Sequence, residues 1–426
     1  MVAKTESGKW LGPTDQTEDY LSQITEAGYD ILEDARSEVY SEEGSGSQRP
    51  AKLWPASQAA AILGRSVGWL RETDPENPIR NTSGHAAWSL KRLMAIAERS
   101  GGLLYKRPQG TRALTLAMAK FKGGVGNSCN AAHLAHGLAI KGLRVLAVDF
   151  DAQASLTAVL GGLIPDIHLE VEDLPNEALT RNPALIADEK AGIIKPTYFH
   201  NVDLLCANSY LNRVEQHLSS YNHGAPPDDT GLNPAERLKV MLSYVENDYD
   251  VILIDCPPTL GMLTTNALEA ADGIISSVRP EAFDRTSLVS FFDTVQGHVE
   301  ITGKQYDYIR ILISQSRDRL PSAGPENAMH NLSERKEEDI REGHRRNEFK
   351  LRRDYGDAIL KSTMDWSPAF GHAIGKFSTV FSAPKKLGAR SSWERGLTIA
   401  QSVVDEVYGD LKAIWELHSK EQEDAA

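Results

Sequence analysis

From about residue 110 onward, the chain alternates between short apolar runs and longer mixed segments. The apolar runs, which we predict to be strands, cover residues 113–119, 144–150, 202–207, 251–255, 273–278 and 309–314. Because these runs are apolar throughout, both faces of each strand should be buried, as in a parallel sheet. The segments between them are long enough for helices. The pattern therefore predicts a doubly wound α/β domain whose ligand binds at the carboxyl ends of the strands.

The first segment of the chain has a helical pattern. Apolar residues at positions 21, 24, 31, 32, 35 and 39 fall near one face, and acidic residues fill the other. Gly, Ser and Pro then cluster in residues 41–50, as in a linker. A single amphipathic helix cannot bury its own apolar stripe, so we expect a partner for it; the same helix in a second copy is one candidate.

Residues 51–100 form a second unit of short helices. Ser57 and Ser89 are the predicted N-caps of its first and third helices, and Gly64 ends the first helix. Two helices around a glycine turn, followed by a hairpin at 82–84, match a winged helix-turn-helix. Basic residues of this unit are candidates for contacts with DNA phosphates: Arg65, Arg71, Lys91 and Arg92. The alternative is a small helical spacer with solubilising charges.

Length and composition narrow the class of protein. With 426 residues the chain exceeds what one hydrophobic core usually organises, so we expect two or three domains. No apolar run reaches the roughly 18 residues of a membrane span, and the first ten residues lack the apolar core of a secretion signal. The three cysteines are too scattered for a disulfide framework or a structural zinc site. We therefore expect a cytoplasmic protein.

The net charge of −13 argues against a surface that binds nucleic acid everywhere. Local basic patches still act within a Debye length of roughly 8–10 Å. Basic residues gather late in the chain in two groups, of which the first is Lys385, Lys386, Arg390 and Arg395 and the second is Arg345, Arg346, Lys350, Arg352 and Arg353. Each group is either a site of non-specific DNA contact or a solvated charged face.

A glycine-rich segment, Lys-Gly-Gly-Val-Gly-Asn-Ser (122–128), follows the first predicted strand and precedes a helix. Backbone N–H groups in such a turn form a concave nest at the positive end of the helix, and this nest cradles phosphates. Gly123, Gly124 and Gly126 allow the backbone to come close and to adopt positive φ. Ser128 has the hydroxyl group needed to bind Mg²⁺.

Acidic residues at the ends of two later strands support this interpretation. Asp149 ends the second predicted strand, Asp151 lies just beyond it, and Asp255 ends the fourth. A carboxylate in that position can hold Mg²⁺, and burying it without a cation or hydrogen bonds is costly. The alternative is that these acids cap the turns that follow. The loop and the acids occur in the order expected of a nucleotide site.

At this point the chain resembles a known family. K-G-G-V-G-N-S, V-D-F-D-A-Q-A-S and V-I-L-I-D-C-P-P together are similar to the deviant Walker motifs of the ParA and MinD ATPases. S-V-R-P-E-A-F-D (277–284) resembles the family's segment near the base and ribose. The N-terminal helix and the winged unit resemble the large ParA proteins, including the RepA members of repABC plasmids. The resemblance implies a dimerisation helix at 1–45, a winged helix-turn-helix domain at 46–108 and a P-loop NTPase domain at 109–426.

The resemblance also implies roles for individual residues. Lys122 would be the signature lysine that reaches the phosphates of the opposite subunit, and Asp151 would position the attacking water. Mg²⁺ would be held by Ser128, Asp149 and Asp255, with Asp255 as the Walker B acid. The residues expected to contact ATP or ADP are Gly123, Gly124, Val125, Gly126, Asn127, Ser128, Cys129 and Pro280.

Asn127 departs from the family, which has a lysine at this position that reaches the β- and γ-phosphates of its own subunit. The amide of Asn127 is shorter and carries no charge. A charge-assisted hydrogen bond is worth about 1.5–3 kcal/mol, so nucleotide affinity should fall by roughly one to two orders of magnitude. Phosphoryl transfer depends on stabilising the charge of the transition state, so the rate of hydrolysis should fall by a larger factor than the affinity. We expect a protein that binds Mg·ATP or Mg·ADP and hydrolyses ATP slowly.

The resemblance implies a cycle of plasmid segregation. ATP would close a homodimer that binds DNA non-specifically, and a ParB-like protein at a centromere would stimulate hydrolysis and release the dimer. The winged unit would bind an operator and repress the protein's own operon. The protein would then be associated with the nucleoid. A membrane partner is not expected, because the last helix ends in acidic residues, unlike the basic membrane-targeting helix of MinD relatives.

Two other functions remain as alternatives. A degenerate ATPase could act as a nucleotide-insensitive DNA-binding repressor or as a decoy subunit, and Asn127 fits that role. A metabolic P-loop enzyme, such as a relative of the cobyrinic-acid amidotransferases, fits less well, because the N-terminal DNA-binding unit has no role there.

Overall fold

The computed structural model describes residues 17–41, 52–120, 122–221, 231–316 and 343–425. The chain divides into two compact units, residues 1–49 and 50–426. In the first unit the predicted N-terminal helix is confirmed as α1 (Thr17–Ser41), and the side chains of Leu21, Ile24 and Ile31 on its apolar stripe are exposed. Residues 42–50 of the predicted linker lie outside the described residues.

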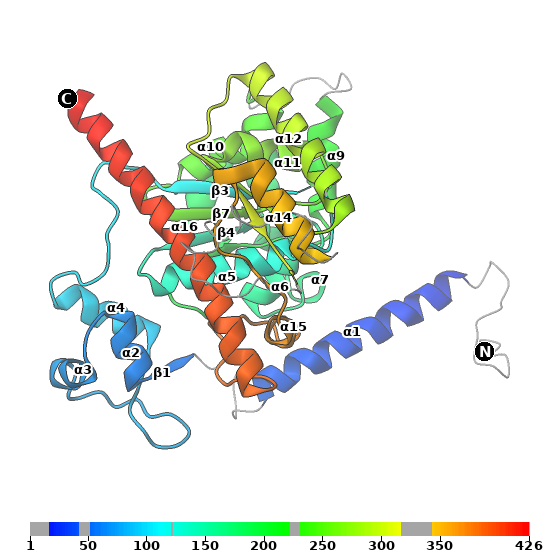
Figure 1. Cartoon of the computed structure of the whole chain (residues 1–426). Helices are drawn as coiled ribbons and strands as arrows, with labels where there is room; N and C mark the ends of the chain where they lie inside the picture. Colours follow the sequence, from blue (N-terminus) through cyan, green and yellow to red (C-terminus); the bar gives the residue numbers. More distant parts are fainter. Residues whose placement is uncertain (1–16, 42–51, 121, 222–230, 317–342, 426) are drawn as a thin grey trace. The chain divides into compact units, whose positions relative to one another are not determined.

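A sheet forms the centre of the second unit (Figure 1). It has seven strands in the order β5-β6-β4-β7-β3-β8-β9. Its strands are β3 (Leu114–Met118), β4 (Val145–Asp149), β5 (Ile194–Pro196), β6 (Val202–Leu205), β7 (Val251–Asp255), β8 (Gly273–Val278) and β9 (Tyr308–Ile313). Neighbouring strands are parallel, except that β5 pairs antiparallel with β6 at one edge. The six predicted strands are confirmed; β5 was not predicted.

The central strand β3 lies between β7 and β8, and the chain leaves it toward β4 on one side and later reaches β8 on the other. This is the topological switch point at which the carboxyl ends of parallel strands leave room for a ligand. The glycine-rich loop directly follows β3, so the fold places it at that point.

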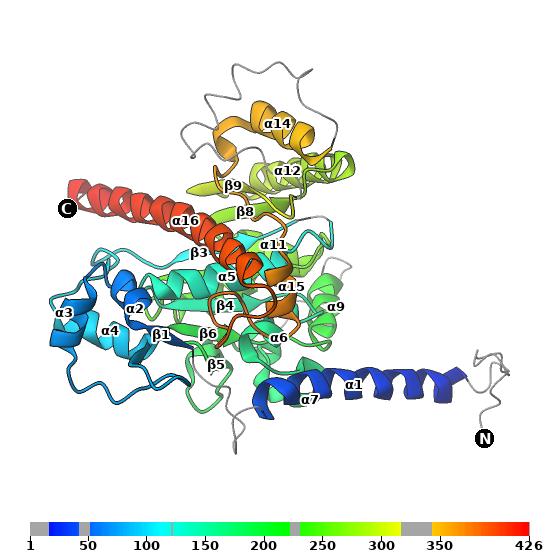
Figure 2. The same cartoon turned by 60° about the horizontal axis from the view of Figure 1, so that its bottom comes forward.

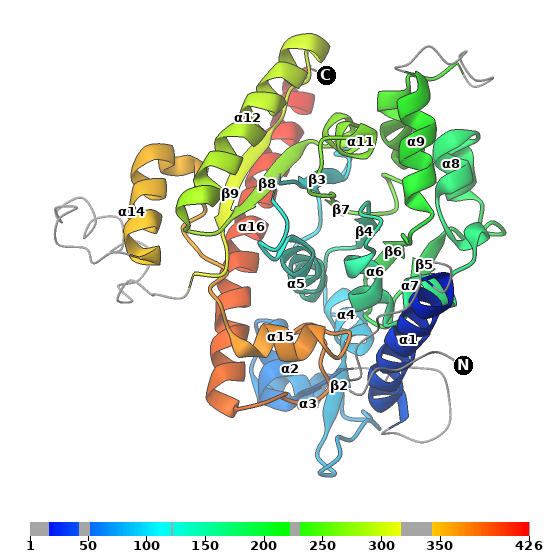
Figure 3. The ribbon, with the colours of Figure 1, turned by 90° about the vertical axis from the view of Figure 1, so that its right-hand side faces the viewer.

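Helices cover both faces of the sheet (Figures 2 and 3). Beyond residue 120 they are α5 (Asn127–Ile140), α6 (Ser155–Gly161), α7 (Pro165–His168), α8 (Asn176–Thr180), α9 (Leu211–Tyr221), α10 (Arg237–Ser243), α11 (Met262–Ala270), α12 (Ala282–Thr302), α14 (His344–Tyr355), α15 (Pro368–Ile374) and α16 (Arg390–Ala425). Short 3₁₀ turns are η2 (Val171–Asp173), η3 (Pro183–Ala187), η4 (Pro234–Glu236) and η6 (Gly356–Ala358). The predicted doubly wound, mostly parallel P-loop NTPase sheet is therefore confirmed.

Each face of the sheet has its own hydrophobic core. On one face α5 and α16 pack on side chains such as Leu116, and on the other face α9, α10 and α11 pack on side chains such as Ile254. The helices α5 and α16 approach closely at Gly137, where an added Cβ would lie 2.3 Å from Val404 Cγ2. Within the described residues no helix is both long and apolar enough to cross a membrane.

The segment before the sheet contains the short elements that the sequence predicts. They are β1 (Leu53–Pro55), α2 (Ala56–Ile62), α3 (Val67–Thr73), β2 (Ala87–Ser89) and α4 (Leu90–Arg99), with β1 and β2 paired antiparallel. Gly64, at φ +61°, forms the turn between α2 and α3, and an antiparallel bridge between residues 80 and 86 encloses the predicted hairpin turn. The DNA-binding interpretation of this arrangement stays a prediction.

Serine caps start two of the helices in this segment. Ser66 accepts a hydrogen bond from the N–H of Trp69 at the start of α3, and Ser89 does the same for Arg92 at the start of α4, as predicted. The prediction for Ser57 is wrong, because α2 begins at Ala56, directly after Pro55, and no side chain caps it. The fixed φ of proline already suits the entry into a helix.

Candidate functional site

The loop between β3 and α5 has the backbone shape of a phosphate cradle. Gly124 and Gly126 adopt φ of +78° and +83°, which other residues rarely reach. Gly126 is the N-cap of α5, and no side chain caps that first turn. The N–H groups at the start of α5 are thus left for an anion, which the helix dipole also favours. Phe121, just before the loop, lies outside the described residues.

Asn127 turns its side chain into the protein, where it is 1% exposed. Its amide Nδ2 donates to the carbonyl of Met118, at 2.7 Å, and to Oδ1 of Asp255, at 2.9 Å. The amide therefore ties the first turn of α5 to the ends of β3 and β7. This double contact was not predicted, because it depends on the pairing of Met118 with Asp255 in the sheet.

Two acids lie side by side at the carboxyl ends of adjacent strands. Asp255 and Asp149 are paired residues of β7 and β4, and both are buried. Burial raises the pKa of Asp255 above its usual range, although hydrogen bonds from Ser128 and Asn127 oppose that rise. Burial and the neighbouring Asp255 likewise raise the pKa of Asp149. A nearby cation would stabilise the charged form of both carboxylates.

The side chains at this edge fit a Mg²⁺ ion that arrives with a nucleotide. Oδ2 of Asp255 is buried and has no hydrogen-bond partner among the described residues, and the nearby Ser128 hydroxyl favours the charged form of the same carboxylate. Mg²⁺ prefers one or two such oxygens, completed by water and phosphate. Asp149 instead accepts hydrogen bonds from the N–H of Thr157, at 2.7 Å, and of Asp151, at 3.3 Å. We therefore expect Asp149 to lie near the ion without being its direct ligand.

Lys122 is held within its own chain. Its ammonium group forms an ion pair with Asp284, which also accepts a hydrogen bond from Arg279 Nε at 2.8 Å. Burial would raise the pKa of Asp284, but Arg279 and Lys122 hold it below its usual range. Pro280, which follows Arg279, is buried. To reach a second subunit, Lys122 would have to leave Asp284.

Lys120 lies at the base of the loop and was not singled out from the sequence. It follows β3 by two residues, is 9% exposed, and lines a narrow cavity together with Lys122, Val125 and Asp284. Burial lowers the pKa of Lys120, whereas Asp255 and Asp151 act in the opposite direction. A lysine at the end of an apolar strand, two positions before the loop, was the available signal.

The remaining residues in and near the loop differ in burial and in hydrogen bonding. Val125 is buried, Gly123 is exposed, and Asp151 is half-buried with its carboxylate accepting the N–H of Gln153 at 3.0 Å. Burial raises the pKa of the Cys129 thiol to about 12, so a thiolate has no role here. Asn130, which sequence reasoning missed, donates to the hydroxyl groups of two serines at the carboxyl ends of β8 and β9.

Most of the predicted DNA-contacting residues are exposed: Arg65, Arg71, Lys91, Lys385, Lys386, Arg390 and Arg395. Several of the predicted residues also pair with carboxylates. Arg92 binds Asp74 through both Nε and Nη2 at 2.7 Å. Lys386 and Arg390 each pair with Glu394 at 2.8 Å. In the second basic group Arg352 pairs with Glu348 at 2.9 Å, and Arg345 is exposed.

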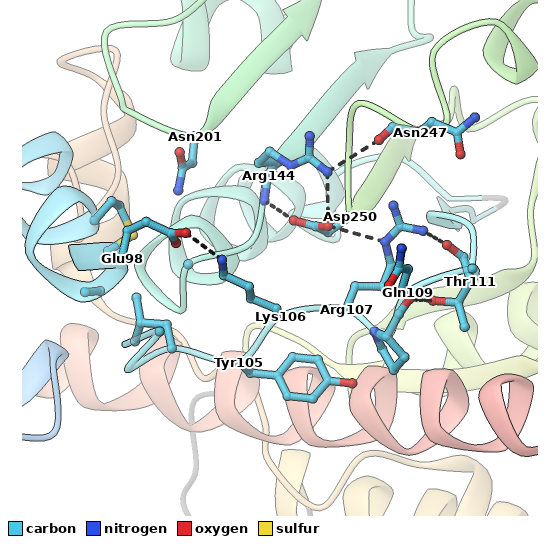
Figure 4. A pocket seen from close by; sticks show the side chains of 17 residues that line it. Glu98, Tyr105, Lys106, Arg107, Gln109, Thr111, Arg144, Asn201, Asn247 and Asp250 are labelled. Atoms are coloured by element: carbon cyan, nitrogen blue, oxygen red, sulfur yellow. Dashed lines mark hydrogen bonds and ion pairs between the residues drawn. The ribbon is translucent and has the colours of Figure 1, made fainter. Parts of the chain in front are cut away.

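A larger cavity, of about 590 Å³, lies at the opposite ends of the strands (Figure 4). Its charged groups are paired with one another: Lys106 pairs with Glu98 at 2.8 Å, and Arg107 and Arg144 both pair with Asp250, at 3.3 and 3.5 Å. Size alone would favour this cavity, but it has neither the glycine loop nor the acidic strand ends. The candidate nucleotide site is therefore the loop after β3.

Comparisons with known proteins agree with this assignment. Residues 113–309 match the AAA_31 family, described as an AAA domain. The chain is 35% identical to a ParA family protein of Chlamydia trachomatis over 190 residues, which cover 43% of this chain and 65% of that protein. The chain contains a ParA-family P-loop domain. The family predicted from the motifs is therefore confirmed.

Two other relatives match this chain beyond that domain. A putative replication protein A of Rhizobium rhizogenes is 28% identical over 87% of this chain and 89% of its own length. Protein SopA of Escherichia coli K12 is 27% identical over 93% of this chain and 98% of its own length. A solved structure described as a partition protein superposes with a TM-score of 0.59 at 18% identity, over 93% of this chain and 98% of that one. This last likeness supports the fold alone.

Proposed function

We propose that this ParA-family protein binds ATP and ADP with Mg²⁺ and uses them to segregate plasmid DNA. The observation that carries the proposal is the meeting of three features at one edge of the sheet: the uncapped start of α5, the Ser128 hydroxyl and the free oxygen of Asp255. Phosphates would bind the backbone N–H groups, and Ser128 and Asp255 would hold the Mg²⁺ that they bring.

In this proposal ATP closes a homodimer that binds DNA non-specifically and so associates with the nucleoid. A ParB-like protein at a centromere then stimulates hydrolysis and releases the dimer. Lys122 would exchange its ion pair with Asp284 for the phosphates of the second subunit, and Asp151 would position the attacking water. One relative matched over most of its length is named a putative replication protein A, and that name fits a role on replicating DNA.

The winged segment would give the protein a second mode of DNA binding, to an operator. Its exposed basic residues Arg65, Arg71 and Lys91 lie on or next to the three helices α2, α3 and α4. Phosphate contacts from such residues set the position of a recognition helix on the duplex. The protein would thereby repress its own operon.

One observation favours a second candidate function, a DNA-binding repressor or decoy that ignores nucleotides. The amide of Asn127 already occupies Oδ1 of Asp255, and it brings no positive charge to the loop. Hydrolysis should therefore be slow in either case. The two candidates differ in whether nucleotide changes DNA binding at all.

DNA binding by the full chain with no nucleotide, with Mg·ADP and with Mg·ATP separates them. The two probes are random-sequence DNA and a fragment from upstream of the protein's own gene. The partition proposal expects random DNA to be bound tightly with ATP alone. Equal binding under all three conditions would establish the repressor or decoy instead.

Two double variants test which surface binds which DNA. Lys385→Ala with Arg395→Ala should weaken random-DNA binding and lower the salt slope by about two. Arg65→Ala with Arg71→Ala should weaken binding to the upstream fragment. Lys190→Ala, at an exposed position, is the control for loss of charge.

A further inference from the structure

Lys120 is a mostly buried lysine at the base of the phosphate loop. Its side chain is 9% exposed, and no hydrogen bond or salt bridge joins it to any other residue that the structure describes. A buried charge without a partner is expensive, and a protein keeps one when a ligand supplies the missing partner. Val125 and Lys122 of the loop line the same cavity as Lys120. An anion bound by the loop would therefore lie close to the Lys120 side chain.

Within one subunit, the other groups near the loop do not supply this charge in the described conformation. Lys122 is already paired with Asp284, which is 2% exposed. Asn127, at the position where the family has lysine, turns its neutral amide inward to Met118 and Asp255. Lys120 is thus the cation at the base of the loop that is not already paired with a carboxylate among the described residues.

We propose that Lys120 neutralises the phosphates of the bound nucleotide, in place of the lysine that Asn127 replaces. The proposal rests on the function proposed above, since it names the residue that makes nucleotide binding possible there. The positive charge would reach the phosphates from the end of β3. Loss of one lysine is compensated by another at a different position in the sequence.

A purely structural role is the competing explanation. Asp255 and Asp151 act electrostatically on Lys120, so the lysine could serve only to offset these acids in the folded protein. The two explanations differ in the protein without nucleotide. If Lys120 offsets the acids, its removal lowers the melting temperature; if it awaits a phosphate, removal of an unpaired buried charge leaves the melting temperature unchanged or raises it.

The test is calorimetry of the full chain with Mg·ADP and Mg·ATP, combined with melting temperatures without nucleotide. Lys120→Met should lower nucleotide affinity by about 10- to 100-fold. Lys120→Arg should retain most of the affinity. Asn127→Lys in the Lys120→Met background should restore it, because a lysine is again present at the family position. Lys190→Met, an exposed lysine, is the control.

Each outcome distinguishes the two proposals. If the unaltered protein binds neither nucleotide, the proposed function fails and the role of Lys120 fails with it. If the unaltered protein binds and Lys120→Met binds equally well, the function stands and the role of Lys120 is wrong. A lower melting temperature of Lys120→Met, or no rescue by Asn127→Lys, would also overturn the role of Lys120.

Discussion

Asn127 illustrates what a sequence motif contains and what it leaves out. The motif shows that position 127 departs from the family and that a positive charge is missing there. Both facts can be read from residue 127 and its neighbours in the sequence. It does not reveal that the amide binds Met118 and Asp255, because those contacts arise from the pairing of β3 with β7. Lys120 was missed for the same reason, since its burial depends on elements far away in the sequence.

Restoring the family lysine should raise ATP turnover. In Asn127→Lys the ammonium group would meet the phosphate charge that develops during transfer, so the rate of phosphate release should rise at least about 10-fold. The measurement is steady-state phosphate release with Mg·ATP in the presence of DNA. Asp151→Asn added to Asn127→Lys should remove the gain, and an unchanged rate in Asn127→Lys would show that position 127 does not limit hydrolysis.

His133 should make the fold sensitive to acid. Its Nδ1 contacts the carbonyl of Cys129 at 2.7 Å, and its Nε2 accepts the N–H of Val380 at 3.3 Å, so the buried ring is neutral. Burial lowers its pKa to about 4, below the unfolded value near 6.5. The unfolded chain therefore binds the proton first, and the stability that this histidine contributes is complete above about pH 6.5 and lost as the pH falls toward 4.

From this shift, the free energy of unfolding should fall by about 2 kcal/mol between pH 7.5 and pH 5 because of His133. Urea unfolding at the two pH values measures the change. His133→Gln, which keeps an acceptor for Val380, should lose that part of the pH dependence, whereas His85→Gln, at an exposed position, should keep it. Identical pH dependence in His133→Gln and the unaltered protein would contradict the prediction.

At the scale of elements, the segment from β1 to α4 is held together by a carboxylate. Asp74, just after α3, accepts hydrogen bonds from Arg92 at 2.7 Å, from the indole of Trp88 at 2.8 Å and from Arg99 at 3.1 Å. Burial would raise the pKa of Asp74, but these three donors hold it below its usual range. The sequence predicted the helices and the Ser89 cap correctly, yet it could not assign Arg92 to Asp74, 18 positions earlier.

Removing that carboxylate should destabilise the segment. Asp74→Ala leaves the buried indole and two guanidinium groups without their acceptor, so the free energy of unfolding should fall by about 2–4 kcal/mol. Urea unfolding followed by tryptophan fluorescence measures it. Glu76→Ala, at an exposed position nearby, is the control, and equal stability of the two variants would refute this role for Asp74.

At the scale of the whole molecule, continuous apolar runs predicted six strands of the sheet and its parallel direction. The order of the strands was not predicted, because the runs are alike in character and pair with partners far away in the sequence. The edge strand β5 was missed because Ile194–Pro196 is short, half-exposed and ends in proline. That the glycine loop and the acidic residues meet at one edge could be predicted, because they lie at strand ends that any parallel arrangement brings together. Their role in nucleotide binding stays a prediction.

The central claim is that residues 122–128 bind nucleotide phosphates although Asn127 stands where the family has lysine. Titration calorimetry of the full chain with Mg·ADP tests it most directly, with Gly126→Ala and Gly84→Ala as a matched pair at φ of +83° and +76°. We predict that the unaltered protein and Gly84→Ala bind Mg·ADP and that Gly126→Ala binds at least about 10-fold more weakly. No binding of Mg·ADP by the unaltered protein, or equal binding by Gly126→Ala, would contradict the account.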